Sequence, residues 1–89
     1  MKITKEVLKE FAEKALEMIE KFHFEPYCIS FWGYGGIDLQ GDYDARVEEK
    51  IINDGFVLAR MHENPKTVFC VYRKDKAEIV LTMKKEKEE

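Results

Sequence analysis

Carboxylate side chains concentrate in the middle of this 89-residue chain, and they are the first candidates for chemistry. Between residues 36 and 54, six acids face only Arg46 and Lys50, so this segment has a net charge of −4. The six are Asp38, Asp42, Asp44, Glu48, Glu49 and Asp54. Grouped carboxylates can hold a metal ion, act as general acid and base, or contact a basic surface.

Two interpretations of these acids stay open. Calcium binding of the EF-hand type needs Asp-x-Asp-x-Asp-Gly and a later bidentate Glu, which this segment does not reproduce. General-acid catalysis needs a buried carboxyl group, whereas these alternate with polar neighbours. The acids either cap helices and keep the chain soluble, or they form a face that binds Lys and Arg groups. In a binding face, Asp38, Gln40, Asp42 and Asp44 would present polar groups at a spacing that can imitate a run of phosphates.

Soft metal ligands and nucleophiles are sparse. His23 and Cys28 are separated by four residues and His62 and Cys70 by seven, so at most one half of a zinc site has suitable spacing. The same residues show no sign of the activating environment that a catalytic thiol needs. The glycine-rich loop at 33–36 lacks the Lys-Ser/Thr pair of a phosphate-binding loop and lies between two expected strands. We therefore expect no enzymatic activity, no metal and no cofactor.

Aromatic residues stand next to the acids. Trp32 is expected on the strand face opposite Phe31, and Tyr34 lies in the loop that follows. They either pack around a hairpin or anchor a partner, because interfaces are enriched in Trp and Tyr. The predicted partner-binding set is therefore Trp32, Tyr34, Asp38, Gln40, Asp42, Asp44, Glu48 and Glu49.

Basic residues cluster in the C-terminal third and define an alternative nucleic-acid contact. They are Arg60, Lys66, Arg73, Lys74 and Lys76. The region has no RNA-binding aromatic signature, and residues 1–54 carry a net charge of −5 against +2 for residues 55–89. Binding of nucleic-acid phosphate is thus the second expectation.

Hydrophobic spacing predicts the elements that position these residues. Residues 4–23 form an amphipathic helix with Thr4 as N-cap, ended by Pro26. Residues 27–32 and 37–40 form a hairpin, with Asp38 and Gln40 pointing outward and Gly41-Asp42 breaking the second strand. Residues 43–53 form a short helix that stops at Gly55.

Three further runs of strand-like residues, 56–61, 67–73 and 77–83, form an antiparallel meander. The fold class is therefore α+β: an N-terminal helix on an antiparallel sheet of about five strands, with a short second helix. Residues 1–83 form one domain and residues 84–89 a charged, frayed tail. The apolar stripe of the first helix is wide enough to leave a homodimer open.

Composition indicates a compartment. The chain is 45% hydrophobic with a net charge of −3, it has no apolar run long enough to span a membrane, and its first residues form no signal peptide. We expect a cytoplasmic protein whose two cysteines are reduced.

The chain also resembles a class of known proteins in its layout. The acidic composition, the opening Met-Lys-Ile-Thr-Lys-Glu helix and the hairpin followed by Gly41-Asp42-Tyr43-Asp44 are similar to small phage and mobile-element proteins of the anti-CRISPR type. The resemblance implies a non-enzymatic inhibitor that uses an acidic face to bind a basic surface of a nuclease or another nucleic-acid-processing protein. It transfers no functional residue to this chain.

Overall fold

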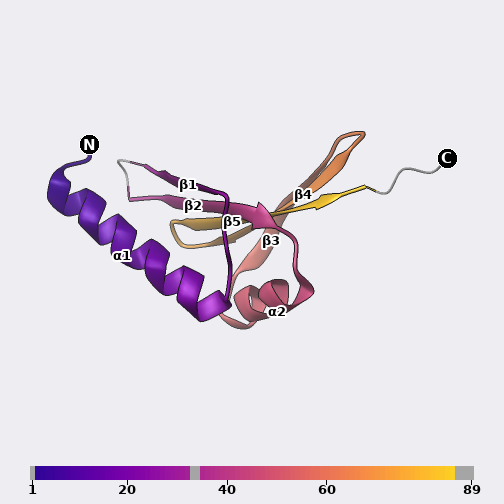
Figure 1. Cartoon of the computed structure of the whole chain (residues 1–89), viewed down its shortest axis with the longest axis horizontal. Coiled ribbons are helices and arrows are strands. Elements are labelled where there is room, and N and C mark those ends of the chain that lie inside the picture. The colour runs from indigo at the N-terminus through magenta and orange to yellow at the C-terminus, as the bar shows by residue number, and fades with distance from the viewer. Residues whose placement is uncertain (1, 33–34, 86–89) are drawn as a thin grey trace.

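The computed structural model describes residues 2–32 and 35–85, in which two helices and five strands follow the predicted order. The α+β class and the sequence of helix, hairpin, short helix and three-stranded meander are confirmed. The elements in chain order are α1 (Lys5–Phe22), β1 (Cys28–Phe31), β2 (Ile37–Asp42), α2 (Ala45–Asn53), β3 (Val57–Glu63), β4 (Thr67–Lys74) and β5 (Ala77–Lys84). Figure 1 shows them as a helical layer beside one twisted sheet.

The sheet is mixed, whereas the sequence predicted antiparallel pairing throughout. Its strand order is β1-β2-β5-β4-β3, and β5 lies parallel to β2 with Leu39 opposite Ile79. Parallel neighbours require a crossover, and the long path through α2, β3 and β4 supplies it. Ile79 and Leu81 of β5 are fully inaccessible to solvent, because β5 lies at the centre of the sheet.

Local signals set the helix ends. The Thr4 hydroxyl accepts a hydrogen bond from the Val7 N–H at 3.2 Å, as predicted for an N-cap. α1 ends at His23, which adopts the left-handed conformation (φ 53°), three residues before Pro26. Asp44 caps α2, and Gly55 follows that helix with φ 108°.

Gly41 does not break β2, contrary to the prediction. The strand continues to Asp42, and Gly41 pairs with Leu81 in the centre of the sheet. A side chain is excluded at this position because the Phe24 ring packs directly on the backbone; a Cβ atom would lie 2.7 Å from two of its ring carbons. The glycine here serves close packing rather than a turn.

The C-terminal strands run further than predicted. β3 reaches Glu63, so only residues 64–66 turn, and Lys84 belongs to β5 rather than to a frayed tail. The Lys85 N–H donates to the Lys66 carbonyl oxygen at 2.9 Å, which holds this end beside the β3–β4 turn. The remainder of the predicted tail, 86–89, lies outside the described residues.

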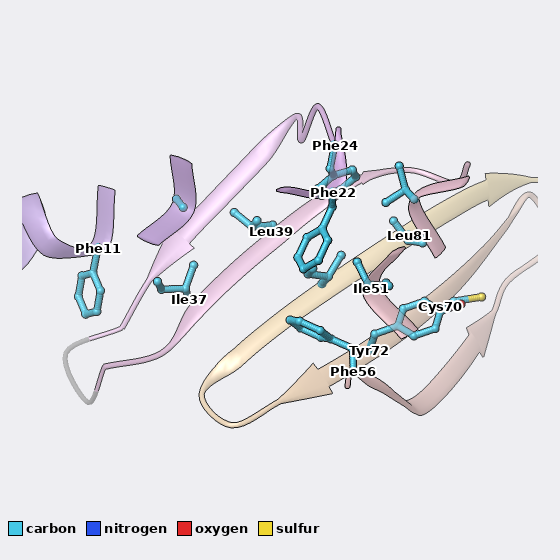
Figure 2. Packing of buried hydrophobic residues seen from close by; sticks show 13 residues of the cluster. Phe11, Phe22, Phe24, Ile37, Leu39, Ile51, Phe56, Cys70, Tyr72 and Leu81 are labelled. Carbon is cyan, nitrogen blue, oxygen red and sulfur yellow. The ribbon is translucent and has the colours of Figure 1, made fainter. Parts of the chain in front are cut away.

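The hydrophobic core lies between the two helices and one face of the sheet (Figure 2). Phe11 and Phe22 of α1 and Ile51 of α2 belong to the same buried cluster as Leu39 of β2 and Tyr72 of β4. Phe22 meets Phe56 edge to face, with ring centroids 5.8 Å apart. Each of these large buried side chains contributes roughly 1.5–3 kcal/mol by leaving water.

The opposite face of the sheet, called the open face below, is turned away from both helices. No described helix or strand lies over it, as Figure 1 shows. Strand alternation and register place its residues: Cys28 and Ser30 of β1; Asp38, Gln40 and Asp42 of β2; Glu78, Val80 and Thr82 of β5; Phe69, Val71 and Arg73 of β4; and Val57, Arg60 and His62 of β3. Its charge is divided, with acids on β2 and arginines on β3 and β4.

Parts of the predicted helix stripe stay exposed. Leu8 and Leu16 of α1 are about half exposed, and every residue of edge strand β3 is exposed. The homodimer stays a prediction. Among the described residues, no helix is long and apolar enough to cross a membrane.

Candidate functional site

The open face brings together the three β2 residues of the predicted binding set. Asp38, Gln40 and Asp42 alternate with the buried residues of β2, so they share one face at steps of roughly 6.8 Å. Glu78 of β5 lies beside Asp38 in the sheet register and adds a third carboxylate. Glu78 was absent from the predicted set, because no sequence signal shows that β5 pairs with β2.

The other acids of the predicted set lie at the N-cap and in the first turns of α2 rather than on a strand. Asp44 accepts the Arg46 backbone N–H at 2.8 Å and the Arg46 guanidinium at 3.2 Å. These contacts hold the pKa of Asp44 below its usual value, with the side-chain hydrogen bond as the largest cause. Glu49 is exposed. Asp44, Glu48 and Glu49 are therefore separate from the β2 acids.

Glu48 is the clearest departure from the predicted binding set. It accepts hydrogen bonds from the Tyr43 hydroxyl at 2.8 Å and from the hydroxyl of buried Tyr72. The contact with Tyr72 joins α2 to β4 within the helix-covered side of the sheet. Glu48 therefore has a structural role, because a partly buried carboxylate satisfies two tyrosines, and its contact with a partner stays a prediction.

Asp54 also has a structural role, because it pairs with two lysines. Its carboxylate contacts the ammonium groups of Lys21 and Lys74, the second at 3.1 Å. These two hydrogen bonds lower the pKa of Asp54, Lys21 being the largest cause. The bridge ties α1 to β4 through the residue that ends α2.

A hydrogen-bonded chain runs across the open face. The Gln40 amide donates to the Tyr27 hydroxyl at 3.1 Å, and that hydroxyl lies 3.1 Å from the Thr82 hydroxyl. Thr82 in turn donates to the Gly41 carbonyl at 3.2 Å, so its oxygen is left to accept from Tyr27. Tyr27 is 60% exposed. Tyr27 is thus a surface residue that the sequence did not reveal.

A hollow of about 620 Å³ opens beside this chain. Tyr27, Phe69 and Thr82 line it together with Asp42 of β2 and Lys84 of β5. Its lining includes three aromatic side chains, one carboxylate and the ammonium group of Lys84. A long basic side chain fits this environment, because its apolar stem can lie on aromatic rings while its charged group reaches a carboxylate.

Asp38 is the most strongly perturbed acid of the open face. Its Oδ1 atom is buried and has no hydrogen-bond partner among the described residues. Desolvation, followed by repulsion from Glu78, raises the pKa of Asp38 above its usual value. Glu78 itself lies 3.8 Å from the Arg73 guanidinium and 4.0 Å from that of Arg60. Asp38 therefore lacks the donor that a buried carboxylate needs.

Asp38→Asn should stabilise the folded protein at neutral pH by roughly 0.5 kcal/mol. A raised folded-state pKa means that Asp38 costs stability once pH rises above that pKa, and costs nothing below the ordinary value of 3.8. The gain should therefore shrink as pH falls towards 3.8. Urea unfolding of wild type and variant at pH 7 and near pH 3.8 checks this. Equal gains at both pH values, or the same gain from Asp42→Asn, would contradict it.

Of the two aromatic candidates, only Trp32 belongs to the described residues. Trp32 follows β1 directly, is 48% exposed, and donates its backbone N–H to the Gly36 carbonyl at 2.9 Å. Tyr34 lies outside the described residues.

The five basic residues of the alternative contact do not form one surface. Arg60 and Arg73 lie on the open face beside Glu78, whereas Lys74 binds Asp54 on the helix-covered side. Lys66 and Lys76 occupy turns at opposite ends of β4.

The cysteines and histidines show no clustering. Cys28 is exposed, Cys70 is buried, and neither is in a disulfide. Burial raises the pKa of the Cys70 thiol. Within residues 2–32 and 35–85, no group of three His, Cys, Asp or Glu side chains is placed to hold a metal ion.

Comparison with known proteins identifies no family. No protein-family model, no curated protein and no solved structure matches this chain.

Proposed function

We propose that this protein is a non-enzymatic interaction module whose open face binds a basic surface of another protein. The observation that supports it is Asp38, a buried carboxylate oxygen on an uncovered sheet face with no donor among the described residues. A Lys or Arg side chain from a partner would supply that donor as a charge-assisted hydrogen bond. It would also relieve the repulsion between Asp38 and Glu78.

Other features of the open face favour a protein partner over a small cation. The hollow at Asp42 is lined by the aromatic side chains of Tyr27, Tyr43 and Phe69, which suit the stem of a long side chain rather than a hydrated ion. Val80 lies between Gln40 and Val71 in the register and gives the face an apolar centre. An apolar centre with a charged periphery is the usual anatomy of a protein interface.

The inhibitor role is the finer part of this proposal. Asp38 and Asp42 lie on the same face of one strand, and proteins that handle nucleic acids carry basic surfaces that bind negatively charged groups. Occupation of a basic groove by these residues would exclude its substrate. The partner we infer is thus a nuclease or another nucleic-acid-processing protein.

Charge reversal tests the proposal. Wild type, Asp38→Lys/Asp42→Lys and a control, Glu10→Lys/Glu13→Lys, are immobilised and exposed to cell lysate at about 50 mM and about 500 mM salt. The control makes the same change of charge on the exposed side of α1. Retained proteins are identified, purified and titrated against each variant, and a retained nuclease is assayed for inhibition.

We expect a basic protein to bind wild type and control at low salt and to bind the β2 variant at least about tenfold more weakly. Circular dichroism confirms that each variant is folded. Equal binding by the β2 variant, or a partner that is not basic, overturns the binding proposal. Binding without inhibition overturns only the inhibitor role.

A further inference from the structure

The two edge strands of the sheet, β1 and β3, differ in how well they are protected against pairing with another chain. β3 carries Arg60, His62 and Glu63 and has a bulge between Leu58 and Arg60, and both features oppose the addition of a further strand. β1 has no charged residue and keeps a regular register with β2 over its whole length. An uncharged, regular edge is a template for a further strand.

The backbone groups of two β1 residues point away from β2. The Trp32 N–H donates to the Gly36 carbonyl at 2.9 Å, which makes this a hydrogen-bonded position of the antiparallel ladder. Since such positions alternate along a strand, Ser30 also bonds to β2. The N–H and C=O groups of Ile29 and Phe31 are therefore turned to the free edge of the sheet.

An exposed apolar flank of α1 lies on the same side of the molecule. Met18 and Lys21 of α1 line a hollow that faces the turn between β4 and β5, so the opposite flank of the helix is turned towards β1. Leu8 and Leu16 lie on that flank and are about half exposed, and Ile29 of β1 is 43% exposed. Apolar side chains thus accompany the free backbone groups.

We infer that a second copy of this chain binds at the free edge of β1, so that two sheets become one continuous sheet about a two-fold axis. Antiparallel pairing centred on Ser30 places Ile29 of each copy opposite Phe31 of the other. Each such pair then exchanges both of its N–H···O bonds. The inference is independent of the proposed binding of a basic surface, because edge pairing uses backbone groups of β1 rather than the acids of β2.

The charges along α1 favour a second copy over a different protein. Lys9, Leu16 and Glu20 are exposed and share one line of the helix, because they follow one another at steps of seven and four residues. A two-fold axis beside β1 makes the two α1 helices antiparallel, so Lys9 of one copy faces the end of the helix that carries Glu20 in the other. The exposed flank is therefore complementary in charge to itself in this orientation.

The wild-type protein allows a first test. Analytical ultracentrifugation over a wide concentration range measures the oligomeric state, and NMR measures amide hydrogen exchange in the same samples. We expect a monomer–dimer equilibrium in which the Ile29 and Phe31 N–H groups exchange more slowly as the dimer forms. A protein that stays monomeric, or an Ile29 N–H whose exchange does not depend on concentration, overturns the inference.

Met61 of β3 provides the internal comparison for hydrogen exchange. The Asn64 N–H donates to the Thr67 carbonyl at 2.9 Å, so alternation turns the Met61 N–H outward as well. Its exchange should not depend on concentration. Protection of Met61 in place of Ile29 would place the dimer contact at β3 and overturn the inference.

Matched proline variants compare the two edges. Ile29→Pro removes one outward N–H and keeps the hydrogen bonds between β1 and β2, since an edge strand tolerates proline where the N–H faces solvent. We expect the dissociation constant of the dimer to rise about tenfold or more. Met61→Pro makes the same change at the edge of β3 and should dimerise as wild type does. Equal effects of the two variants would overturn the inference.

A cysteine variant tests the register. Residues at a non-hydrogen-bonded pair of facing strands are close enough for a disulfide, so Cys28→Ser/Ser30→Cys should oxidise to a covalent dimer. The control Cys28→Ser/His62→Cys places the new thiol at the β3 edge and should not cross-link. Equal cross-linking of the two variants, or none in the Ser30 variant, would contradict pairing centred on Ser30.

Discussion

Gly41→Ala should lower the free energy of unfolding by about 2 kcal/mol. The direction is unusual, because alanine in the interior of a strand is normally more stable than glycine by roughly 0.5–1 kcal/mol. At this position a Cβ atom would lie 2.7 Å from the Phe24 ring and 3.2 Å from the Glu25 carbonyl oxygen. The Phe24 ring is 2% exposed, and side chains in a closely packed core resist displacement.

A double-mutant cycle isolates this contact. Urea unfolding is measured for wild type, Gly41→Ala, Phe24→Ala and the double variant. Phe24→Ala alone should cost roughly 3–5 kcal/mol, since it removes a buried ring. In that background the Gly41→Ala cost should disappear or change sign, because the ring that excludes the Cβ atom is gone. Additive costs would show that the ring is not what requires glycine.

The case of Gly41 shows where sequence reasoning about the fold stopped. Helix caps and strand alternation depend on neighbours in the chain, so the Thr4 cap and the outward side chains of β2 were predictable. The need for glycine at Gly41 depends on Phe24, which follows a different element. Local rules therefore gave the common interpretation of Gly41-Asp42, a strand break.

The same limit applies to strand order. The parallel pairing of β2 with β5 joins segments separated by α2, β3 and β4. No residue pattern in either segment indicates that it pairs with the other. Tight turns in the meander made antiparallel pairing the natural expectation. The open face, with Glu78 beside Asp38, exists only because of that long-range pair.

The same distinction between local and long-range information applies to the candidate site. Alternation correctly placed Asp38 and Gln40 on the solvent-facing side of β2. It could not show that Gln40 binds Tyr27, or that the basic residues of the turns separate to opposite ends of β4. Charge is visible in a sequence, but its grouping on a surface depends on topology.

Glu48→Ala should lower the free energy of unfolding by about 3 kcal/mol. The Glu48 carboxylate accepts the hydroxyl protons of Tyr43 and Tyr72, and hydrogen bonds to a charged acceptor are stronger than those to a neutral one. Tyr72 is 2% exposed, so removal of the carboxylate takes the acceptor away from a buried hydroxyl. An unsatisfied buried donor is the larger part of the expected cost.

Glu49→Ala is the matched control, since the neighbouring residue loses the same charge from an exposed position. It should change stability by no more than about 0.5 kcal/mol. Glu48→Gln should fall between the two, because its amide retains one acceptor oxygen. Urea unfolding at pH 7 orders the three variants, and similar costs for Glu48→Ala and Glu49→Ala would contradict the structural role of Glu48.

The stability of the protein at high pH gives a second test of the hydrogen bonds that Glu48 accepts from Tyr43 and Tyr72. Burial and the hydrogen bond to Glu48 raise the pKa of Tyr72 above its ordinary value of 10.0. A raised folded-state pKa means that stability is fully present below pH 10 and falls as pH rises, because the unfolded chain loses the proton first. Tyr72→Phe should remove part of the stability that is lost at alkaline pH. If the free energy of unfolding falls as steeply above pH 10 in this variant as in wild type, the titrating group is another residue.

The role of Glu48 in the fold also affects the binding test. Since Glu48 variants weaken the fold itself, lost partner binding in them would not identify an acidic interface. Asp38 and Asp42 are the acids whose variants can identify one.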